Sequence, residues 1–172
     1  MKPLLSDHPE FYVRYISLVT NDSVTEAMLH TKKEVERLMN RLNEDLGNYA
    51  YANGKWTIKE VLLHCIDTER IFSTRALSFA RGESQKALSF DEDTYAANSH
   101  ANTRTLQNIM QEFESVNAAT FNLFSSFAEQ VLQTVGETPS GSATVNAVGF
   151  AICGHSLHHM GVIRERYLKD LK

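Results

Sequence analysis

Residues that interrupt helices are scarce in this sequence, which has three prolines and eight glycines among 172 residues. Because proline breaks helices and glycine weakens them, this scarcity leaves room for long helical segments. The sequence also lacks any run of about 18 apolar residues, so a membrane-spanning helix is excluded. No apolar stretch followed by a small-residue cleavage site occurs at its start. We therefore expect a cytoplasmic protein with no membrane partner.

Positive charge is in short supply as well. Lysine and arginine total 17, aspartate and glutamate total 21, and the net charge is −4. A general nucleic-acid-binding protein needs a clustered basic surface that displaces counterions from phosphates, so this class is excluded. The apolar fraction of 42% is ordinary for a globular protein. The length predicts a single domain over residues 1–172, with a core of its own.

The sequence has only two cysteines, Cys65 and Cys153. Both fall inside helical patterns rather than in loops, and a cytoplasmic protein keeps its thiols reduced. We therefore expect two buried free thiols that serve packing, and no disulfide.

An N-terminal arm, residues 1–20, precedes the main helices. Pro9 suits the first turn of a short helix in this arm, and Phe11, Tyr12 and Tyr15 give that helix an apolar side. We expect the arm to dock either on the rest of the chain or on a second subunit, and its aromatic residues favour a homodimer.

Two S/T-x-x-E capping boxes predict where the first two long helices begin, because each side chain in this motif binds a free backbone N–H of the other residue. The first box, Ser23 with Glu26, starts a helix that ends at Gly47. The second box, Thr57 with Glu60, starts a helix that ends near residue 80.

Two further long helices are predicted in the second half of the chain. An aromatic-rich apolar stripe, best explained by core packing, runs from Leu106 to Val131. Residues 136–142 form the clearest loop, after which Ser142 or Thr144 can cap a last helix that extends to about Leu168. The pattern predicts an all-α four-helix bundle.

The connection between the second and third helices is polar, acidic and long, covering residues 81–102. A segment of this length can span a bundle from end to end. Short connections join antiparallel neighbours, whereas one long connection permits the second and third helices to run parallel. We therefore predict up-down-down-up topology with one long crossover between helices 2 and 3.

The histidines carry the functional prediction. His155 and His159 are one helical turn apart, so their imidazoles share a face and can bind one metal ion with bonds of about 2.0–2.1 Å. His158 points elsewhere. His64, on an inward stripe of the second helix, is the best candidate for a third ligand. The remaining three histidines are interpreted as solvated surface residues: His8, His30 and His100.

Charged residues near the predicted ligands have open roles. Glu60 and Asp67 lie about one turn before and after His64, the spacing of a carboxylate that orients a ligand or acts as a general base. Glu60 also has its capping role, and Asp67 can instead pair with an arginine. Arg166 falls two turns after His159 and could bind an anionic substrate, although a structural salt bridge is the simpler explanation.

Two segments resemble the signature of the DinB/YfiT-like family of metal-dependent enzymes. Residues 54–64, Gly-Lys-Trp-Thr-Ile-Lys-Glu-Val-Leu-Leu-His, resemble its G-x-W-[ST]-x-x-[EQ]-x-x-x-H motif, and residues 155–159 resemble its closing H-x-x-H-H segment. The resemblance spans about residues 9–168, including the acidic stretch 90–93. It implies a four-helix bundle in which His64, His155 and His159 bind the metal. Some members continue the last motif with Gly-Gln, whereas Val162 follows Gly161 here, which weakens any subgroup assignment.

Three neutral imidazoles leave at least one position of a metal ion open, which is typical of catalytic sites. We expect one divalent transition metal, zinc first, with nickel, iron or cobalt as alternatives. The resemblance implies a hydrolase, or an S-transferase that uses a low-molecular-weight thiol such as bacillithiol or mycothiol, with a small-molecule substrate. The alternative is a non-catalytic metal- or ligand-binding dimeric bundle with a stress-related role.

Overall fold

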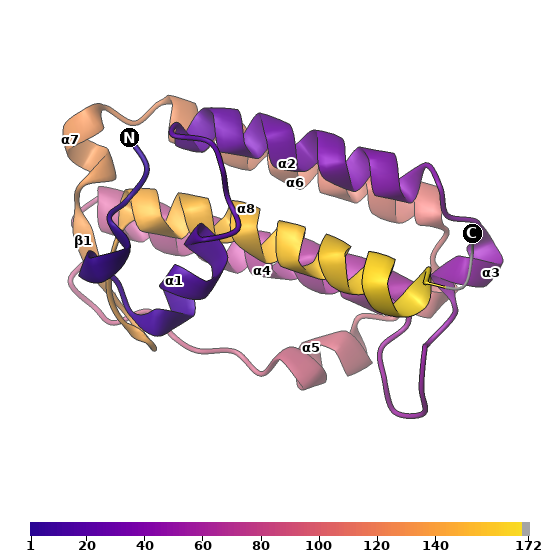
Figure 1. Cartoon of the computed structure of the whole chain (residues 1–172). Helices are drawn as coiled ribbons and strands as arrows, with labels where there is room; N and C mark the ends of the chain where they lie inside the picture. The colour runs from indigo at the N-terminus through magenta and orange to yellow at the C-terminus, as the bar shows by residue number, and fades with distance from the viewer. Residues whose placement is uncertain (170–172) are drawn as a thin grey trace.

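The computed structural model describes residues 1–169 and is built around four long helices (Figure 1). These are α2 (Val24–Met39), α4 (Ile58–Ala80), α6 (Leu106–Ser125) and α8 (Val145–Val162). Four short helices accompany them: α1 (Glu10–Ile16), α3 (Glu44–Gly47), α5 (Glu92–Asn98) and α7 (Glu129–Leu132). Short 3₁₀ turns cover Leu5–Asp7 and Ala101–Thr103. The predicted four-helix bundle is confirmed.

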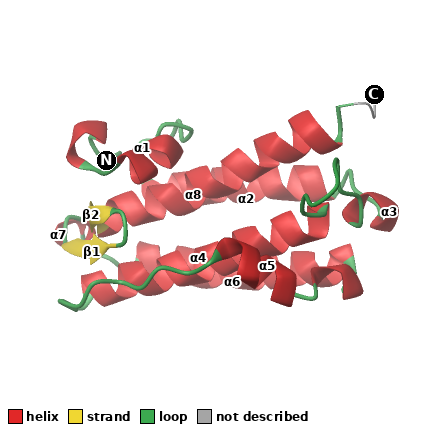
Figure 2. Ribbon diagram, turned by 90° about the horizontal axis from the view of Figure 1, so that it is seen from below, coloured by secondary structure: helices red, strands yellow, loops and turns green. Residues whose placement is uncertain are grey.

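The long helices form a closed arrangement in which α8 packs on α2 and α4, and α6 packs on the same two helices. Helices α2 and α8 run in one direction, and α4 and α6 run in the other (Figure 1). After α4 the chain returns along the bundle through α5 before α6 begins (Figure 2). The up-down-down-up topology with one long crossover is therefore confirmed. No helix in the described part of the chain has the length and apolar character of a membrane span.

The long helices α2, α4 and α8 begin directly after the predicted cap residues Ser23, Thr57 and Thr144, but only two of these caps make the expected hydrogen bonds. The Thr57–Glu60 capping box forms, with the Thr57 N–H donating to the Glu60 carboxylate at 2.7 Å and the Glu60 N–H donating to the Thr57 hydroxyl at 3.2 Å. Thr144 caps α8 by accepting the Ala147 N–H at 3.0 Å. The box predicted at Ser23 is wrong, because the Ser23 hydroxyl bonds with the Thr25 hydroxyl and makes no cap hydrogen bond.

Two predicted helix ends are too late. Helix α2 ends at Met39 rather than at Gly47, since Asn43 accepts the Leu46 N–H and begins the separate helix α3. Helix α6 ends at Ser125, and the apolar pattern continues into α7 because Phe127 packs edge-on against Phe124. In both cases apolar spacing continues across a break in the helix, because the residues after the break also face the core.

A β-hairpin replaces the loop predicted between the last two helices. Strands β1 (Val135–Thr138) and β2 (Gly141–Thr144) pair antiparallel, with Val135 opposite Thr144. Gly141 has φ of +119°, a conformation that favours glycine, and it follows the tight Pro139–Ser140 turn. The hairpin lies at the end of the bundle where α8 begins (Figure 2).

Helix α8 is the central helix of the molecule and is buried without interruption over Val145–Ser156. Its outer face is covered as well, because α1 packs on it (Figure 1). Gly154 permits the contact, since a Cβ atom at this position would lie 2.0 Å from the Tyr15 carbonyl oxygen. The arm docks on its own bundle, one of the two predicted alternatives.

We expect Gly154→Ala to push α1 away from α8 and to lower the free energy of unfolding by about 1–3 kcal/mol, the usual cost of overpacking. Gly161→Ala is the matched control in the same helix, because a Cβ atom there meets nothing within 4 Å. The control should be neutral or gain about 0.5–1 kcal/mol from better helix propensity. Chemical denaturation measures both, and equal effects would contradict close packing at Gly154.

Several polar groups are buried between the long helices. Glu69 of α4 is 2% exposed, and burial raises the pKa of its carboxyl to about 7, although Thr120 and Asn117 of α6 oppose the rise. Cys65 and Cys153 are buried and free, as predicted, and burial raises the pKa of the Cys153 thiol to about 12 and that of Cys65 further. Both cysteines are therefore unreactive thiols near neutral pH.

The pKa of Glu69 predicts a pH dependence of stability. Its folded-state pKa of about 7 lies above its ordinary value of 4.5, so its contribution to stability is present below pH 4.5 and is lost as pH rises through 7. Glu69→Gln, which cannot ionise, should therefore gain stability relative to the unsubstituted chain over this range, by on the order of 3 kcal/mol. Urea denaturation from pH 4.5 to 8 measures the difference. Glu114→Gln, at an exposed position of α6, is the control, and a flat difference for Glu69→Gln would contradict the prediction.

Candidate metal centre

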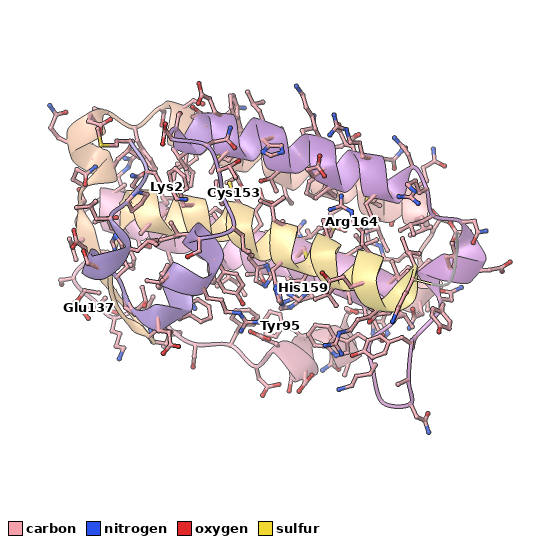
Figure 3. All side chains as sticks on the ribbon, viewed as in Figure 1. Lys2, Tyr95, Glu137, Cys153, His159 and Arg164 are labelled. Carbon is pink, nitrogen blue, oxygen red and sulfur yellow. The ribbon has the colours of Figure 1, made fainter. Side chains whose placement is uncertain are left out.

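Three histidines from two facing helices meet in the bundle. His64 comes from α4, and His155 and His159 come from α8, which packs along α4. The Nε2 atoms of His64 and His155 are 3.0 Å apart, and the candidate ligand atoms of all three residues lie within 4.8 Å of one another. His159 projects from α8 on the side where the crossover passes (Figure 3). The structure thus brings together the three residues that the sequence predicted as ligands.

The spacing of these nitrogens fits a shared metal ion. Two nitrogens that are each about 2.0–2.1 Å from one ion lie roughly 3 Å apart. A hydrogen bond between two neutral imidazoles would give a similar separation of His64 and His155, but a single N–H cannot also bind His159. The His64 Nδ1 atom is buried and has no hydrogen-bond partner among the described residues.

Burial keeps the three imidazoles neutral. It lowers the pKa of His64 to about 4, where the Asp93 carboxylate opposes the effect, and lowers that of His159 to about 3. The pKa of His155 is well below its ordinary value because of burial first and the neighbouring histidines second. At neutral pH each ring therefore offers the uncharged lone pair that a metal ligand requires.

Aromatic residues hold the imidazoles in place. The Trp56 ring lies 4.9 Å from the His64 ring, centroid to centroid, and Tyr15 meets His155 edge-on at 5.3 Å. The Tyr167 hydroxyl donates to the Trp56 carbonyl at 2.7 Å. Sequence reasoning missed the role of Tyr15, because that role depends on the docking of α1. Trp56 lies within the quoted motif, and its spacing from His64 was a signal that could have been used.

The other histidines lie outside the cluster of three. His158 approaches the guanidinium of Arg14 at 3.3 Å, on a different face of α8 from His155 and His159. His100 is exposed, as predicted. His30 is half-buried and bonds with Asn21 at 3.1 Å. His8 is half-buried as well, with a buried Nδ1 atom and a pKa that burial lowers, so the surface interpretation is only partly correct for His8 and His30.

The two carboxylates considered near His64 have structural contacts instead. Asp67 pairs with Arg70 at 3.5 Å, and Arg70 also contacts Glu112 of α6. Glu60 completes the capping box and accepts a hydrogen bond from Asn102 at 3.2 Å, which ties the crossover to the start of α4. Neither contact leads to the three histidines.

Arg166 does not continue the stripe of His155 and His159. Residues Ile163–Tyr167 form a π-helix, in which the Leu168 N–H donates to the Ile163 carbonyl five residues earlier. The wider turn shifts later side chains around the helix axis. Arg166 is exposed, lies 5.8 Å from the Tyr51 ring and forms no salt bridge with a residue in the range 1–169, so the salt bridge expected for it is wrong.

A cavity of about 160 Å³ adjoins His155. It forms where α1, α4, the crossover, the hairpin turn and α8 meet. Glu92 of the crossover is its acidic residue, and partial burial together with Asp93 raises the pKa of this carboxyl. The cavity is lined by Phe11, Tyr12, Thr68, Phe72, Arg75, Ser89, Phe90, Glu92, Thr138, Pro139, Ser140 and His155.

The chain is similar to known proteins in both sequence and fold. The DinB superfamily model matches residues 27–163, so the chain belongs to the DinB superfamily. YfiT from Bacillus subtilis, described as a probable metal-dependent hydrolase with an unusual four-helix bundle topology, is similar with a TM-score of 0.77 and 15% identity, covering 87% of this chain and 86% of YfiT. A mycothiol-dependent maleylpyruvate isomerase is similar with a TM-score of 0.67 and 13% identity, covering 98% of this chain and 70% of the isomerase. No curated protein matches the sequence.

The position of Trp56 gives a direct readout of metal binding, because it is the only tryptophan of the chain and its ring packs on His64. We expect Co²⁺ or Ni²⁺ to quench its fluorescence, with saturation at one ion per chain. His64→Ala should abolish the quenching, whereas His158→Ala should keep it. Equal quenching of the two variants would contradict an ion bound at His64.

Proposed function

We propose that His64, His155 and His159 bind one divalent transition metal and that the chain is a metal-dependent enzyme acting on a small molecule. The observation that carries the proposal is the convergence of three neutral imidazoles, two of them buried and that of His159 half-buried, beside a cavity. Among the described residues no cysteine or carboxylate joins this group as a fourth ligand. Such a site keeps a position open for water or substrate, as catalytic rather than structural sites do. Zinc is the expected ion and nickel its main competitor.

The surroundings of the histidines suit chemistry on a bound small molecule. A metal ion in such a site lowers the pKa of a bound water to about 7, activates a thiolate or polarises a carbonyl. Phe11, Phe72 and Phe90 supply apolar walls that exclude bulk water from the cavity. Glu92 is the one acidic residue among the described residues that line the cavity. Its raised pKa suits a proton acceptor.

Two reaction classes are consistent with this arrangement: hydrolysis, and transfer to a low-molecular-weight thiol. Hydrolysis needs a water between the histidines and Glu92, and the description of YfiT as a probable metal-dependent hydrolase supports this class. Thiol transfer needs room for a thiolate at the same position, and the mycothiol dependence of the second structural relative supports it. The buried thiols of Cys65 and Cys153 cannot take that role, so the thiol would come from a cosubstrate.

The alternative of a non-catalytic dimeric bundle loses one argument for the dimer. A homodimer was predicted from the aromatic residues of the N-terminal arm, but Tyr12, Tyr15 and Ile16 are buried within the chain's own fold. These residues are therefore not available to a second subunit. The homodimer stays a prediction without that argument.

We expect metal-dependent turnover in a screen of ester, amide and thiol-conjugation substrates, with the metal content of each variant measured in parallel. Replacing His64, His155 or His159 by Ala removes one of three ligands and should abolish both metal occupancy and turnover. The same variants should lose the rise in Tm that metal causes. For the unsubstituted chain, metal at one hundred times Kd adds about 2.7 kcal/mol to the free energy of unfolding. His158→Ala is the control and should retain metal. Loss of metal from His158→Ala with retention by His155→Ala would overturn the assignment.

A further inference from the structure

A buried arginine without an acidic partner lies in the cavity beside the histidines. Arg75 of α4 is 9% exposed, and it forms no salt bridge with any residue in the range 1–169. Its Nη2 atom donates to the Leu88 carbonyl at 2.6 Å, and its guanidinium lies 4.9 Å from the Phe72 ring. One backbone carbonyl and one aromatic face leave most of the five N–H donors of the guanidinium free.

Leaving this charge unpaired costs stability. Arginine is almost never buried without a partner, because transfer of an ion from water is expensive unless it is paired. Burial lowers the pKa of Arg75, but a guanidinium stays charged in proteins. Glu92 lines the same cavity without reaching Arg75, so the cavity has an acidic residue on the crossover and a separate, uncompensated cation on α4.

Two hydroxyl groups in the same cavity also lack partners. The Tyr12 hydroxyl and the Thr68 hydroxyl are buried and make no hydrogen bond with a described residue. Buried hydroxyls are normally hydrogen-bonded, so each is an unused polar group. The Tyr12 hydroxyl lies next to Thr138 and Arg75. Burial raises its pKa, and these polar neighbours oppose the rise without making a hydrogen bond of full geometry with it. A cation and two hydroxyls are therefore available to one ligand.

These groups continue the row that His64 begins on α4. Thr68, Phe72 and Arg75 follow His64 at about one, two and three turns, and a long side chain on a helix leans back toward the N-terminus. Arg75 thus extends back along α4 toward His64. His155 lines the cavity that contains Arg75. A ligand held by Arg75 in this cavity therefore lies on the side of α4 that faces His155.

We propose that Arg75, Tyr12 and Thr68 bind the carboxylate of a small organic acid, and that this acid is the substrate class of the site. A planar carboxylate accepts two parallel N–H bonds from a guanidinium, and the hydroxyls can donate to its remaining lone pairs. The cavity of about 160 Å³ is smaller than the roughly 300 Å³ of a typical complete ligand pocket, so it suits an acid group with a short chain. The identification as substrate rests on the proposed metal-dependent function, whereas the carboxylate site itself needs no metal.

The test is an NMR titration with sodium butyrate and with butyramide, which match in shape and differ in charge. It is run on the chain treated with EDTA and on the chain loaded with Zn²⁺. We expect butyrate to bind the metal-free chain at one site and butyramide to bind at least tenfold more weakly. Arg75→Gln should weaken butyrate binding at least tenfold, and Arg81→Gln, at an exposed position at the end of α4, should change it less than twofold. The titration of the EDTA-treated chain does not depend on the ion. It therefore tests the carboxylate site even if Zn²⁺ does not bind.

Tyr12→Phe separates ligand binding from a structural role of Arg75, because it removes one hydroxyl and leaves Arg75 in place. This variant should fold at least as stably as the unsubstituted chain and bind butyrate three- to tenfold more weakly. If Arg75→Gln does not fold, Tyr12→Phe decides the matter. Unchanged butyrate affinity in the folded variants, equal binding of butyramide, or tighter binding of inorganic phosphate than of butyrate would each overturn the proposal.

Discussion

The close contact between α1 and α8 at Gly154 is the constraint on which the rest of the site depends. Because Gly154 has no side chain, the backbone of Tyr15 reaches the surface of α8 one residue before His155. This contact buries the outer face of α8, places the Tyr15 ring against His155 and brings Tyr12 into the neighbouring cavity. A larger residue at position 154 would push α1 away from α8 and would move Tyr15 and Tyr12 away from His155.

The bundle buries several polar and charged groups that do not stabilise it. His64, Arg75 and Glu69 all lie on α4 and are at most 9% exposed, and each has its pKa shifted by burial toward the uncharged form. Such groups oppose folding, and the two apolar clusters, one around the first half of α8 and one around its C-terminal end, offset the cost. Costs of this kind concentrate at functional sites, which agrees with the position of Arg75 in the cavity that His155 lines and of His64 against His155.

Topology decides what covers that cavity. Because α4 and α6 run parallel, the connection between them must return along the length of the bundle (Figure 2). This return carries Phe90 and Glu92 past the open side of α4 and α8. The Leu88 carbonyl that accepts from Arg75 and the Asn102 side chain that donates to Glu60 fix the segment near each end. A short antiparallel connection would leave the cavity without this wall.

The sequence by itself determined the helices, the parallel second and third helices, and the shared face of His155 and His159, because each follows from spacing within a helix or from the length of a connection. Local rules failed where a residue depends on distant neighbours. The apolar spacing across residues 39–47 and 125–131 hid breaks in the helices, and the π-helix after Val162 changed the helical spacing between His159 and Arg166. The meeting of Tyr12, Arg75, Glu92 and His155 was decided only by the tertiary structure, since four segments far apart in the sequence must pack before their side chains can form one cavity.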